Sequence, residues 1–449
     1  MNTICAISTP HGTGGIAVAR ISGPEAFEIA DRIWKGKRLS DATSHTAHYG
    51  CIIDPEQHDD PELDHGVATV FRAPRSFTGE NIVELAIHGS PWLQRELINL
   101  LIRQGARLAE PGEFSRRAFT NGRLDLAEAE AVADMIATSS RAAHRIAMSH
   151  MRGDLSRKLS ALRDDLLRLC ALLELELDFS EEDVTFADRN ELISLASHIN
   201  HTVSAMARSF ATGNALKNGI NTAIVGATNA GKSTLLNRLL NDDKAIVSPI
   251  HGTTRDTIED TAEINGRLYR FIDTAGLRHT DDPIECIGIS RSIAAISKAD
   301  IIIWMIDPEN PDTQTPAHFT NSNTPIIAVV NKADLGLPHP AIPIKTAATI
   351  TLSALADVDI TPLTDALATI ANIDDTTAEI TITNARHYQA LNAATQSTQR
   401  AIEALSANIP ADLVAQDLRE TIHHLSSITG TITTPDILTH IFSHFCIGK

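Results

Sequence analysis

Residues 226–234 form a glycine-rich segment, GATNAGKST, near the middle of this 449-residue chain. The segment follows the apolar run 222–225 and opens a helical stretch, which is the context that a phosphate-binding loop requires. Its glycines let backbone N–H groups surround phosphate oxygens, and the N-terminus of the helix adds partial positive charge. Lys232 can reach the β- and γ-phosphates, and Ser233 can offer a hydroxyl to Mg²⁺. A chance glycine-rich turn is the weaker alternative, so the segment indicates binding of a nucleoside triphosphate.

A second segment, DTAG at residues 273–276, follows the predicted strand 267–272. Asp273 can hold Mg²⁺ through a water molecule, and the N–H of Gly276 can meet the γ-phosphate. In many GTPases a glutamine after this segment orients the attacking water, but here that position is Leu277. Some other group must therefore position the water.

A switch-like segment, GTTRD at residues 252–256, lies between the phosphate loop and Asp273. Thr254 is the candidate for the second hydroxyl ligand of Mg²⁺. Arg255 could act as an internal arginine finger, but a solvated loop charge is the more common role of such a residue.

Guanine specificity is predicted by NKAD at residues 331–334, which follows the strand 325–330. Asp334 can accept hydrogen bonds from N1–H and the exocyclic amine of guanine, which adenine cannot donate at those positions. The pair SA at residues 353–354 follows a further apolar run and can place a backbone N–H on the guanine carbonyl. Four segments in this order, each at the carboxyl end of a predicted strand, indicate a GTPase fold.

The elements that must position these segments alternate between strands and helices from residue 221 to about residue 371. Short apolar runs lie at residues 222–225, 301–306, 325–330 and 349–352. Such alternation predicts a mostly parallel sheet covered on both faces. Asn265 and Gly266 stand between two further strand-like runs and predict a hairpin turn.

The chain before this region changes character at about residue 120. Strands are expected at 15–22 and 82–88 and helices at 25–34 and 92–104, a pattern typical of α+β domains. From residue 124 to about residue 210, leucines at spacings of three and four predict long amphipathic helices. These leucines are Leu155, Leu159, Leu162, Leu166, Leu169 and Leu173.

Helical periodicity returns after residue 371, with Gly430 as the stop of one helix and Thr434 as the N-cap of the next. The sequence therefore predicts a multidomain protein of α/β and α class. We expect an N-terminal α+β domain at residues 1–120, a discontinuous helical domain at 121–215 and 375–449, and an inserted P-loop G domain with a Ras-like doubly wound sheet at 216–374.

The composition restricts the class of protein further. A net charge of −18 argues against a protein that coats nucleic acid with a broad basic field. The five cysteines are far apart and form no CxxC pair, so they are expected to be reduced thiols of a cytosolic protein. Neither a secretory signal nor an apolar run long enough to span a bilayer is found, and the predicted location is cytoplasmic.

Several motifs are spread over the whole chain: RISG at residues 20–23, PGEFSRRAF at 111–119, LDLAEAEA at 124–131, NAGKS at 229–233, DTAGLR at 273–278 and FCIGK at 445–449. Together they resemble the tRNA modification GTPase MnmE (TrmE) family. The resemblance implies a K⁺-activated GTPase that is a homodimer and is activated when its G domains meet. It also implies that a potassium ion takes the place of an arginine finger.

The resemblance assigns roles that the residues alone do not. Glu285 would be the catalytic glutamate, in addition to Lys232, whose role the phosphate-loop motif already predicts. The Mg²⁺ ligands remain Ser233 and Thr254, as predicted above from the residues. The implied K⁺ ligands are Asn229, Ser248, Ile250 and Thr253. The full set of expected GTP-binding residues is Asn229, Ala230, Gly231, Lys232, Ser233, Thr234, Ser248, Pro249, Ile250, His251, Gly252, Thr253, Thr254, Asp273, Thr274, Ala275, Gly276, Asn331, Lys332, Ala333, Asp334, Ser353, Ala354 and Leu355.

The N-terminal region resembles the folate-binding, dimer-forming domain of the same family. The implied contacts to 5-formyltetrahydrofolate, or a related tetrahydrofolate derivative, are Arg20, Glu84, Arg123 and Lys449. The implied partners are tRNA and an FAD-dependent MnmG (GidA) protein, in a heterotetramer or larger complex. The resemblance then implies addition of an aminomethyl-type group, such as carboxymethylaminomethyl, to C5 of the wobble uridine of tRNA.

A second reading remains open, namely a GTP-dependent conformational switch in ribosome or RNA assembly without modification chemistry. The acidic balance and the FCIGK ending favour the first reading. Three positions depart from the family pattern: Thr228 for proline, Leu355 for a polar residue and Arg123 for lysine. Cys446 is either packing or part of a site, and a metal site with the nearby His440 and His444 lacks an evident fourth ligand.

Overall fold

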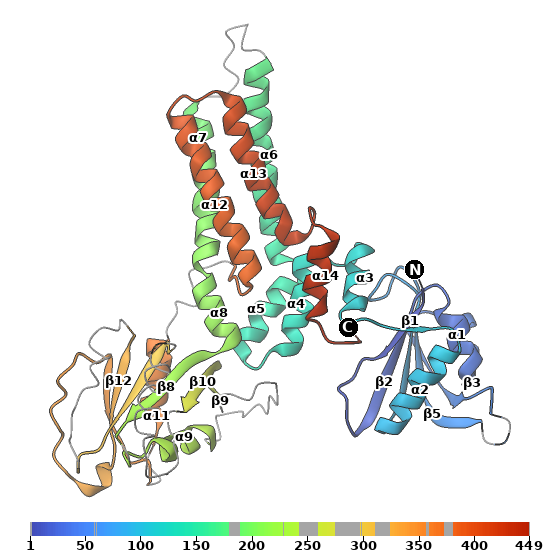
Figure 1. Cartoon of the computed structure of the whole chain (residues 1–449), viewed down its shortest axis with the longest axis horizontal. Coiled ribbons are helices and arrows are strands. Elements are labelled where there is room, and N and C mark those ends of the chain that lie inside the picture. Colours follow the sequence, from blue (N-terminus) through green and yellow to red (C-terminus); the bar gives the residue numbers. More distant parts are fainter. Residues whose placement is uncertain are drawn as a thin grey trace, which may run out of the picture. The chain divides into compact units, whose positions relative to one another are not determined.

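The computed structural model describes residues 2–57, 59, 61–178, 189–227, 229–241, 259–273, 297, 299–309, 324–355, 359–371 and 380–448 (Figure 1). These residues belong to two compact units. The first contains Met1–Ile136, His150–Leu167 and Ile422–Lys449, and the second contains Ala137–Ser149 and Arg168–Thr421. Each unit is described by itself below.

The first unit is built on a seven-stranded sheet in the order β3-β4-β5-β6-β2-β1-β7. All neighbouring strands are antiparallel except β1 and β7, which are parallel. The strands are β1 Ile4–Ile7, β2 Gly14–Ser22, β3 Trp34–Lys35, β4 Thr46–Ile53, β5 Glu62–Phe71, β6 Ile82–Gly89 and β7 Arg107–Leu108.

Helices α1 (Ala26–Ile33) and α2 (Pro91–Arg103) bury their apolar sides against the sheet. Ile29, Ile33, Leu97 and Leu101 are fully buried there, as the amphipathic spacing in the sequence predicts. Two strands and two helices expected in this region are therefore confirmed to within one or two residues at each end.

The same unit contains α3 (Glu113–Thr120), α4 (Leu126–Ala137) and α14 (Pro435–Ser443). Thr434 caps α14, and its hydroxyl accepts a hydrogen bond from the N–H of Ile437. Phe442 of α14 packs with Leu126 and Ala129 of α4 in a small buried cluster. The sequence-based prediction of a Thr434 cap is thus confirmed, and the end of the chain is fixed to the start of the helical region.

Six further helices are described in the rest of the chain outside the second sheet. They are α5 Arg141–Met151, α6 Asp154–Asp178, α7 Arg189–Arg208, α8 Phe210–Asn218, α12 Ala385–Ser406 and α13 Ala411–Thr429. In the second unit α7 and α12 lie side by side (Figure 1). The leucine stripe predicted a long helix, and those leucines are buried on one side of α6.

The second unit also holds a six-stranded sheet in the order β13-β12-β11-β8-β10-β9, in which only β9 is antiparallel to its neighbour. Its strands are β8 Ile220–Gly226, β9 Glu259–Ile264, β10 Arg267–Asp273, β11 Ile301–Ile306, β12 Ile326–Val330 and β13 Ala348–Thr351. Helices α9 (Lys232–Asn241) and α11 (Thr361–Ile370) pack on one face.

The side chains of strand β11 show that this sheet is buried on both faces. Ile303 and Met305 belong to the core on the α9 and α11 side, whereas Ile302 and Trp304 belong to the core on the other side. Every residue of β11 is buried. This is why its sequence is continuously apolar and does not alternate between apolar and polar residues. The predicted doubly wound sheet and its hairpin at Asn265 are confirmed.

The two segments that join this sheet to α7 and α12 are tied together. The hydroxyl of Ser209 accepts a hydrogen bond from the N–H of Ile382 at 3.0 Å, and the rings of Phe210 and Tyr388 stack with centroids 4.5 Å apart. A Cβ on Gly213 would lie 2.0 Å from the carbonyl oxygen of Ile382, so only glycine allows this approach. The first segment then continues from α8 directly into β8.

Candidate functional site

The phosphate-binding loop connects the end of β8 to the first turn of α9. Gly226 has φ of +157°, Gly231 has φ of +95° and Asn229 has φ of +66°, so the loop turns through conformations that most side chains disfavour. A Cβ on Gly231 would lie 2.2 Å from Nδ2 of Asn331. Glycine is therefore required both by the backbone and by the neighbouring guanine-side segment.

Lys232 is held by the loop itself. Its Nζ donates to the carbonyl oxygens of Gly226 and Ala227, each at 2.8 Å. The ammonium group is thus already placed at the mouth of the loop, at the N-terminus of α9 where an anion is favoured. Ser233 follows as the second residue of the same helix.

Asn331 connects the phosphate loop with the guanine-side segments. Its Nδ2 donates to the carbonyl oxygen of Ala230 at 2.8 Å, and its Oδ1 accepts from the N–H of Ala354 at 2.8 Å. The side chain is buried, with only 4% exposed. One amide therefore joins the loop after β8, the loop after β12 and the loop after β13.

Asp334 is exposed in a short 3-10 helix, Ala333–Leu335, which begins two residues after Asn331. The N–H of Ala333 donates to the carbonyl oxygen of Leu352, which ties this turn to β13. Ser353 and Ala354 are buried, whereas 85% of Leu355 is exposed. Asp334 therefore has a firmly held backbone and a carboxylate open to solvent.

Lys332 shows a feature that the sequence did not reveal. Its Nζ lies 2.7 Å from Oδ2 of Asp307 and 2.6 Å from Oε2 of Glu309. The hydrogen bond to Asp307, then that to Glu309, raises the pKa of Lys332. Asp307 is the residue after β11, so it was detectable only as a charge at the end of an apolar strand.

Several expected residues fall outside the described ranges. Asp273 ends β10 beside Ile224 of β8, and only its backbone is described. The others are Thr228, Ser248, Pro249, Ile250, His251, Gly252, Thr253, Thr254, Thr274, Ala275, Gly276, Glu285 and Lys449. The residues that the structure brings together are those of the phosphate loop and of the two guanine-side segments.

In the N-terminal unit, Arg20 and Glu84 face each other across β2 and β6. Nε and Nη2 of Arg20 lie 2.8 and 2.7 Å from Oε1 of Glu84. The guanidinium also lies over the rings of Phe77 and Phe114, at 5.5 and 5.6 Å. Two of the four residues expected to contact a folate are thus paired with each other, and Arg20 lies over one buried and one partly exposed aromatic ring.

Arg123 is on the turn after α3, and its side chain lies beside Gly79 and Asn121. The carboxyl end of the chain is near the end of β1, because the hydroxyl of Ser8 donates to the carbonyl oxygen of Gly448 at 3.1 Å. The N–H of Gly112 likewise donates to the carbonyl oxygen of Cys446. Cys446 itself is exposed.

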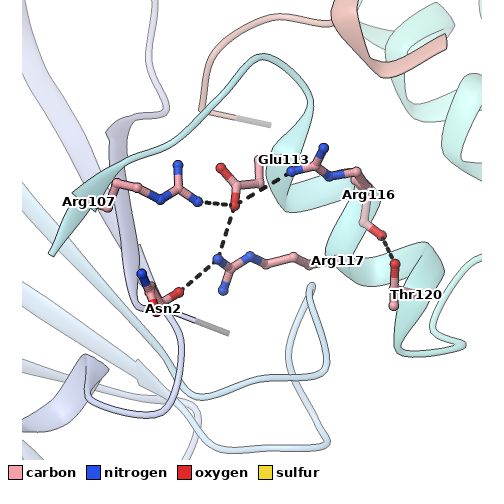
Figure 2. A pocket seen from close by; sticks show the side chains of 6 residues that line it. All are labelled: Asn2, Arg107, Glu113, Arg116, Arg117 and Thr120. Carbon is pink, nitrogen blue, oxygen red and sulfur yellow. Dashed lines mark hydrogen bonds and ion pairs between the residues drawn. The ribbon is translucent and has the colours of Figure 1, made fainter. Parts of the chain in front are cut away.

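A cavity of about 330 Å³ lies between α3, β7 and the start of the chain. Figure 2 shows three arginines around the carboxylate of Glu113. Nη2 of Arg107 lies 2.5 Å and Nη2 of Arg117 lies 3.0 Å from Oε1, while the N–H of Glu110 donates to Oε2. The lining is completed by Asn2, Arg116 and Thr120.

The charges of this cavity are satisfied by one another. Arg117 is also bound by both carboxylate oxygens of Glu80, at 3.0 and 3.1 Å. Burial on its own would raise the pKa of Glu113, but hydrogen bonds from Arg107, Glu110 and Arg117 outweigh it and hold the pKa below its usual range. We therefore interpret the cluster as a buried ion-pair network that fixes α3 to the sheet.

The described helices include none that is both long enough and apolar enough to cross a bilayer.

The strand order, the phosphate loop and the joined guanine-side segments define a P-loop GTPase domain. Residues 126–446 match the model described as "MnmE helical domain", and residues 3–123 match "GTP-binding protein TrmE N-terminus". The chain belongs to the tRNA modification GTPase MnmE family. It is a GTP hydrolase that acts in tRNA modification.

Two curated relatives match the chain over its full length. The tRNA modification GTPase MnmE of Parabacteroides distasonis is 49% identical over 464 residues and covers all of both chains. That of Bacteroides fragilis is 45% identical over 470 residues, covering 100% of this chain and 99% of the relative. A crystal structure of Era from Aquifex aeolicus, 27% identical, covers 39% of this chain and 65% of its own, with a TM-score of 0.27.

Asn331→Ala should weaken binding of guanine nucleotides by about 10- to 100-fold. The substitution leaves the buried carbonyl of Ala230 and the N–H of Ala354 without their partner, at about 1–3 kcal/mol for such groups. Titration with a fluorescent GDP analogue measures the effect. Leu335→Ala, on the exposed side of the same turn, is the control and should bind normally. Equal affinity of Asn331→Ala and wild type would contradict the bridging role.

Glu113→Gln should lower the free energy of unfolding by about 3 kcal/mol, because it breaks a buried ion pair. Since the pKa of Glu113 is lowered in the folded state, its contribution is complete above the ordinary value near 4.5 and is lost as the pH falls below it. The difference between variant and wild type should therefore shrink in acid.

Urea unfolding followed by tryptophan fluorescence, at neutral and at acidic pH, tests this expectation. Glu110→Gln is the matched control, because its partner Arg116 and its own side chain are far more exposed. A pH-independent difference, or one no larger than that of the control, would show that the network contributes little.

Proposed function

We propose that this chain is a K⁺-activated GTPase whose G domains dimerise during hydrolysis, and whose cycle serves wobble-uridine chemistry. With an FAD-dependent partner of the MnmG (GidA) type it would add an aminomethyl-type group, such as carboxymethylaminomethyl, to C5 of the wobble uridine. The observation that carries most weight is the full-length similarity to tRNA modification GTPases, combined with a phosphate loop joined to its guanine-side segments.

The loop chemistry supports the metal part of the proposal. Ser233 offers a hydroxyl at the start of α9, and Thr254 is proposed as its counterpart, both being oxygen ligands suited to Mg²⁺. Asn229 is exposed on the loop and carries a neutral amide oxygen, which suits a monovalent cation. Ser248, Ile250 and Thr253 are proposed to complete the K⁺ site.

K⁺ bound at Asn229 supplies positive charge near the phosphates, as an arginine finger does in other GTPases. A separate group must orient the attacking water, because Leu277 cannot do so in the way that a glutamine does. Glu285 is proposed to orient the attacking water through an intermediary once two G domains meet. Lys232, held by the loop carbonyls, is placed to bind the β- and γ-phosphates.

A tetrahydrofolate site is proposed around Arg20 and Glu84. The carboxylate could pair with the amidine-like edge of a pterin, and basic groups such as Arg123 and Lys449 could meet the glutamate tail. The partly exposed ring of Phe77 lies beneath Arg20 and offers this site an apolar contact, while Phe114 is buried below it. Because the described end of the chain lies near β1, it supports a contribution from Lys449 to the same unit.

The three-domain division is also a proposal, with an α+β domain at residues 1–120 and a helical domain at 121–215 and 375–449 around a G domain at 216–374. The match to residues 3–123 supports the first boundary. A homodimer and a heterotetramer or larger complex with the FAD-dependent partner are proposed on the same family grounds.

A GTP-dependent switch in ribosome or RNA assembly is the second candidate. Such a switch would need no folate site, and a broad basic face on the protein would support this interpretation. The net charge of −18 and the match to the TrmE N-terminal model speak for the modification reading.

Replacing Na⁺ by K⁺ at equal ionic strength should speed GTP hydrolysis by the wild type about tenfold or more, equivalent to about 1.4 kcal/mol of barrier. Asn229→Ala should lose this difference while keeping its rate in Na⁺. The control is Asn237→Ala, an exposed asparagine on α9 that should respond to K⁺ like the wild type. Equal wild-type rates in both salts, or an unchanged K⁺ response of Asn229→Ala, would remove the proposed role.

Cells lacking this gene should accumulate tRNAs whose wobble uridines carry no aminomethyl-type group at C5. Mass spectrometry of digested tRNA measures the modified nucleosides, and pseudouridine serves as the internal control. Re-expression of the wild-type chain should restore them, whereas Asn331→Ala should do so poorly. Unchanged wobble uridines in the deletion strain would instead favour the assembly switch.

A further inference from the structure

Three side chains with different ligand atoms meet on strands β4 and β5, far in sequence from the GTPase motifs. They are Cys51, Glu62 and His65, and one sulfur, nitrogen or oxygen atom of each lies within 4.8 Å of the other two. In the part of the chain that the structure describes, this is the one group of three such residues that could hold a metal ion.

The strand register explains how the three come together. Cys51 pairs directly with His65 across the antiparallel β4–β5 ladder, so their side chains leave the same face of the sheet. The register shifts between Ile52 and Ile53, and Glu62 then pairs with Ile53. A strict alternation would place Glu62 on the other face from His65, three residues away, but this irregularity brings its carboxylate to the same side.

We propose that Cys51, Glu62 and His65 bind a divalent zinc-class ion, with a fourth position filled by water. A thiolate, an imidazole nitrogen and a carboxylate oxygen are the ligands that Zn²⁺ takes in proteins. A sulfur ligand disfavours Mg²⁺ and Ca²⁺, which prefer oxygen. On binding, the thiol of Cys51 loses its proton to solvent, and sulfur then donates an electron pair to the ion.

The distances are near those that a tetrahedral ion requires. Nε2 of His65 lies 3.7 Å from Oε2 of Glu62. Two such ligands, each about 2.0–2.1 Å from a tetrahedral zinc ion, are roughly 3.4 Å apart. His65 and Glu62 are 55% and 47% exposed, so both can rotate toward Cys51, which is held in place by burial.

The neighbouring groups already orient two of the ligands. Oη of Tyr49 lies 3.4 Å from Nδ1 of His65, and the two rings stack, which leaves Nε2 directed at Glu62. Such contacts to the second ring nitrogen are typical of metal-binding histidines. Nζ of Lys35 donates to Oε1 of Glu62 at 3.1 Å and leaves Oε2 for the ion.

Two features of the site oppose binding of a metal ion. Lys35 brings a positive charge to the carboxylate, and Glu62 with His65 could simply form a surface ion pair. Exposed pairs of this kind contribute little, so the ion has only a weak competitor to displace. Asp64 is engaged elsewhere, since its carboxylate bonds Nδ1 of His88 at 2.8 Å, and it is not a fourth ligand.

Co²⁺ titration of the full-length protein tests the proposal, because thiolate ligation to Co²⁺ gives a charge-transfer absorption band. The wild type should show a band that saturates at one equivalent per chain and disappears when Zn²⁺ is added. Cys51→Ser should lose the band. His65→Asn, at an exposed position that does not threaten folding, should weaken Co²⁺ binding by about tenfold or more.

Cys446→Ser is the matched control, because Cys446 is exposed and is close in sequence to His440 and His444, whose rings are in contact and could offer cobalt a second place to bind. This variant should keep the full band. The proposal is overturned if the wild type shows no charge-transfer band, or if the band survives in Cys51→Ser and is lost in Cys446→Ser. GTP hydrolysis is measured alongside and should be the same in all these variants.

Discussion

The buried amide of Asn331 is the contact on which the nucleotide site depends. It joins Ala230 of the phosphate loop to Ala354 of the segment after β13, and both bonds are 2.8 Å long. Gly231 must lack a side chain for this amide to fit, because a Cβ there would lie 2.2 Å away. The phosphate and guanine halves of the site are therefore not independent. A shift of either loop has to break a buried hydrogen bond or carry the other loop along.

This joined site is connected to the helices through the segment that runs from α8 into β8, which is tied to the returning segment at Ile382. Strand β8 ends in the phosphate loop and begins directly after α8, while Ser209 and Gly213 hold the returning segment at Ile382. The stacked rings of Phe210 and Tyr388 close the same junction. A displacement of β8 during a GTPase cycle would consequently be passed to α8 and to the start of α12. Elements that are packed in this way move as rigid bodies and do not deform gradually.

The features that could be predicted from the sequence are those determined by residues close together in the chain. The continuously apolar β11, the hairpin turn at Asn265 and the Thr434 cap are encoded within a few residues, and the structure confirms them. The segments at the carboxyl ends of β8 and β12 were also predictable, because parallel strands bring those ends to one edge. The contacts of Glu113 with Arg107 and of Lys332 with Asp307 were not, since each depends on how separate elements pack. Cys51 and His65 meet only through a strand register that no single strand reveals.

The pairing of Arg20 with Glu84 restricts which ligands the N-terminal surface can accept. The side chain of Arg20 is about one-fifth exposed and that of Glu84 about one-quarter exposed. Leaving either charge without a partner in this partly buried position would cost free energy. A ligand with only an anionic group would pair with Arg20 but leave Glu84 without a partner. A purely cationic ligand would pair with Glu84 but leave Arg20 without a partner. A molecule that carries both a hydrogen-bond-donating edge and a carboxylate can replace the pair without leaving either charge alone. The tetrahydrofolate proposed as the ligand has both features, and the partly exposed ring of Phe77 beneath Arg20 could contact a flat heterocycle. On this proposal, the Arg20–Glu84 ion pair would select against simple ions, because such an ion would break the pair and leave one of its charges without a partner.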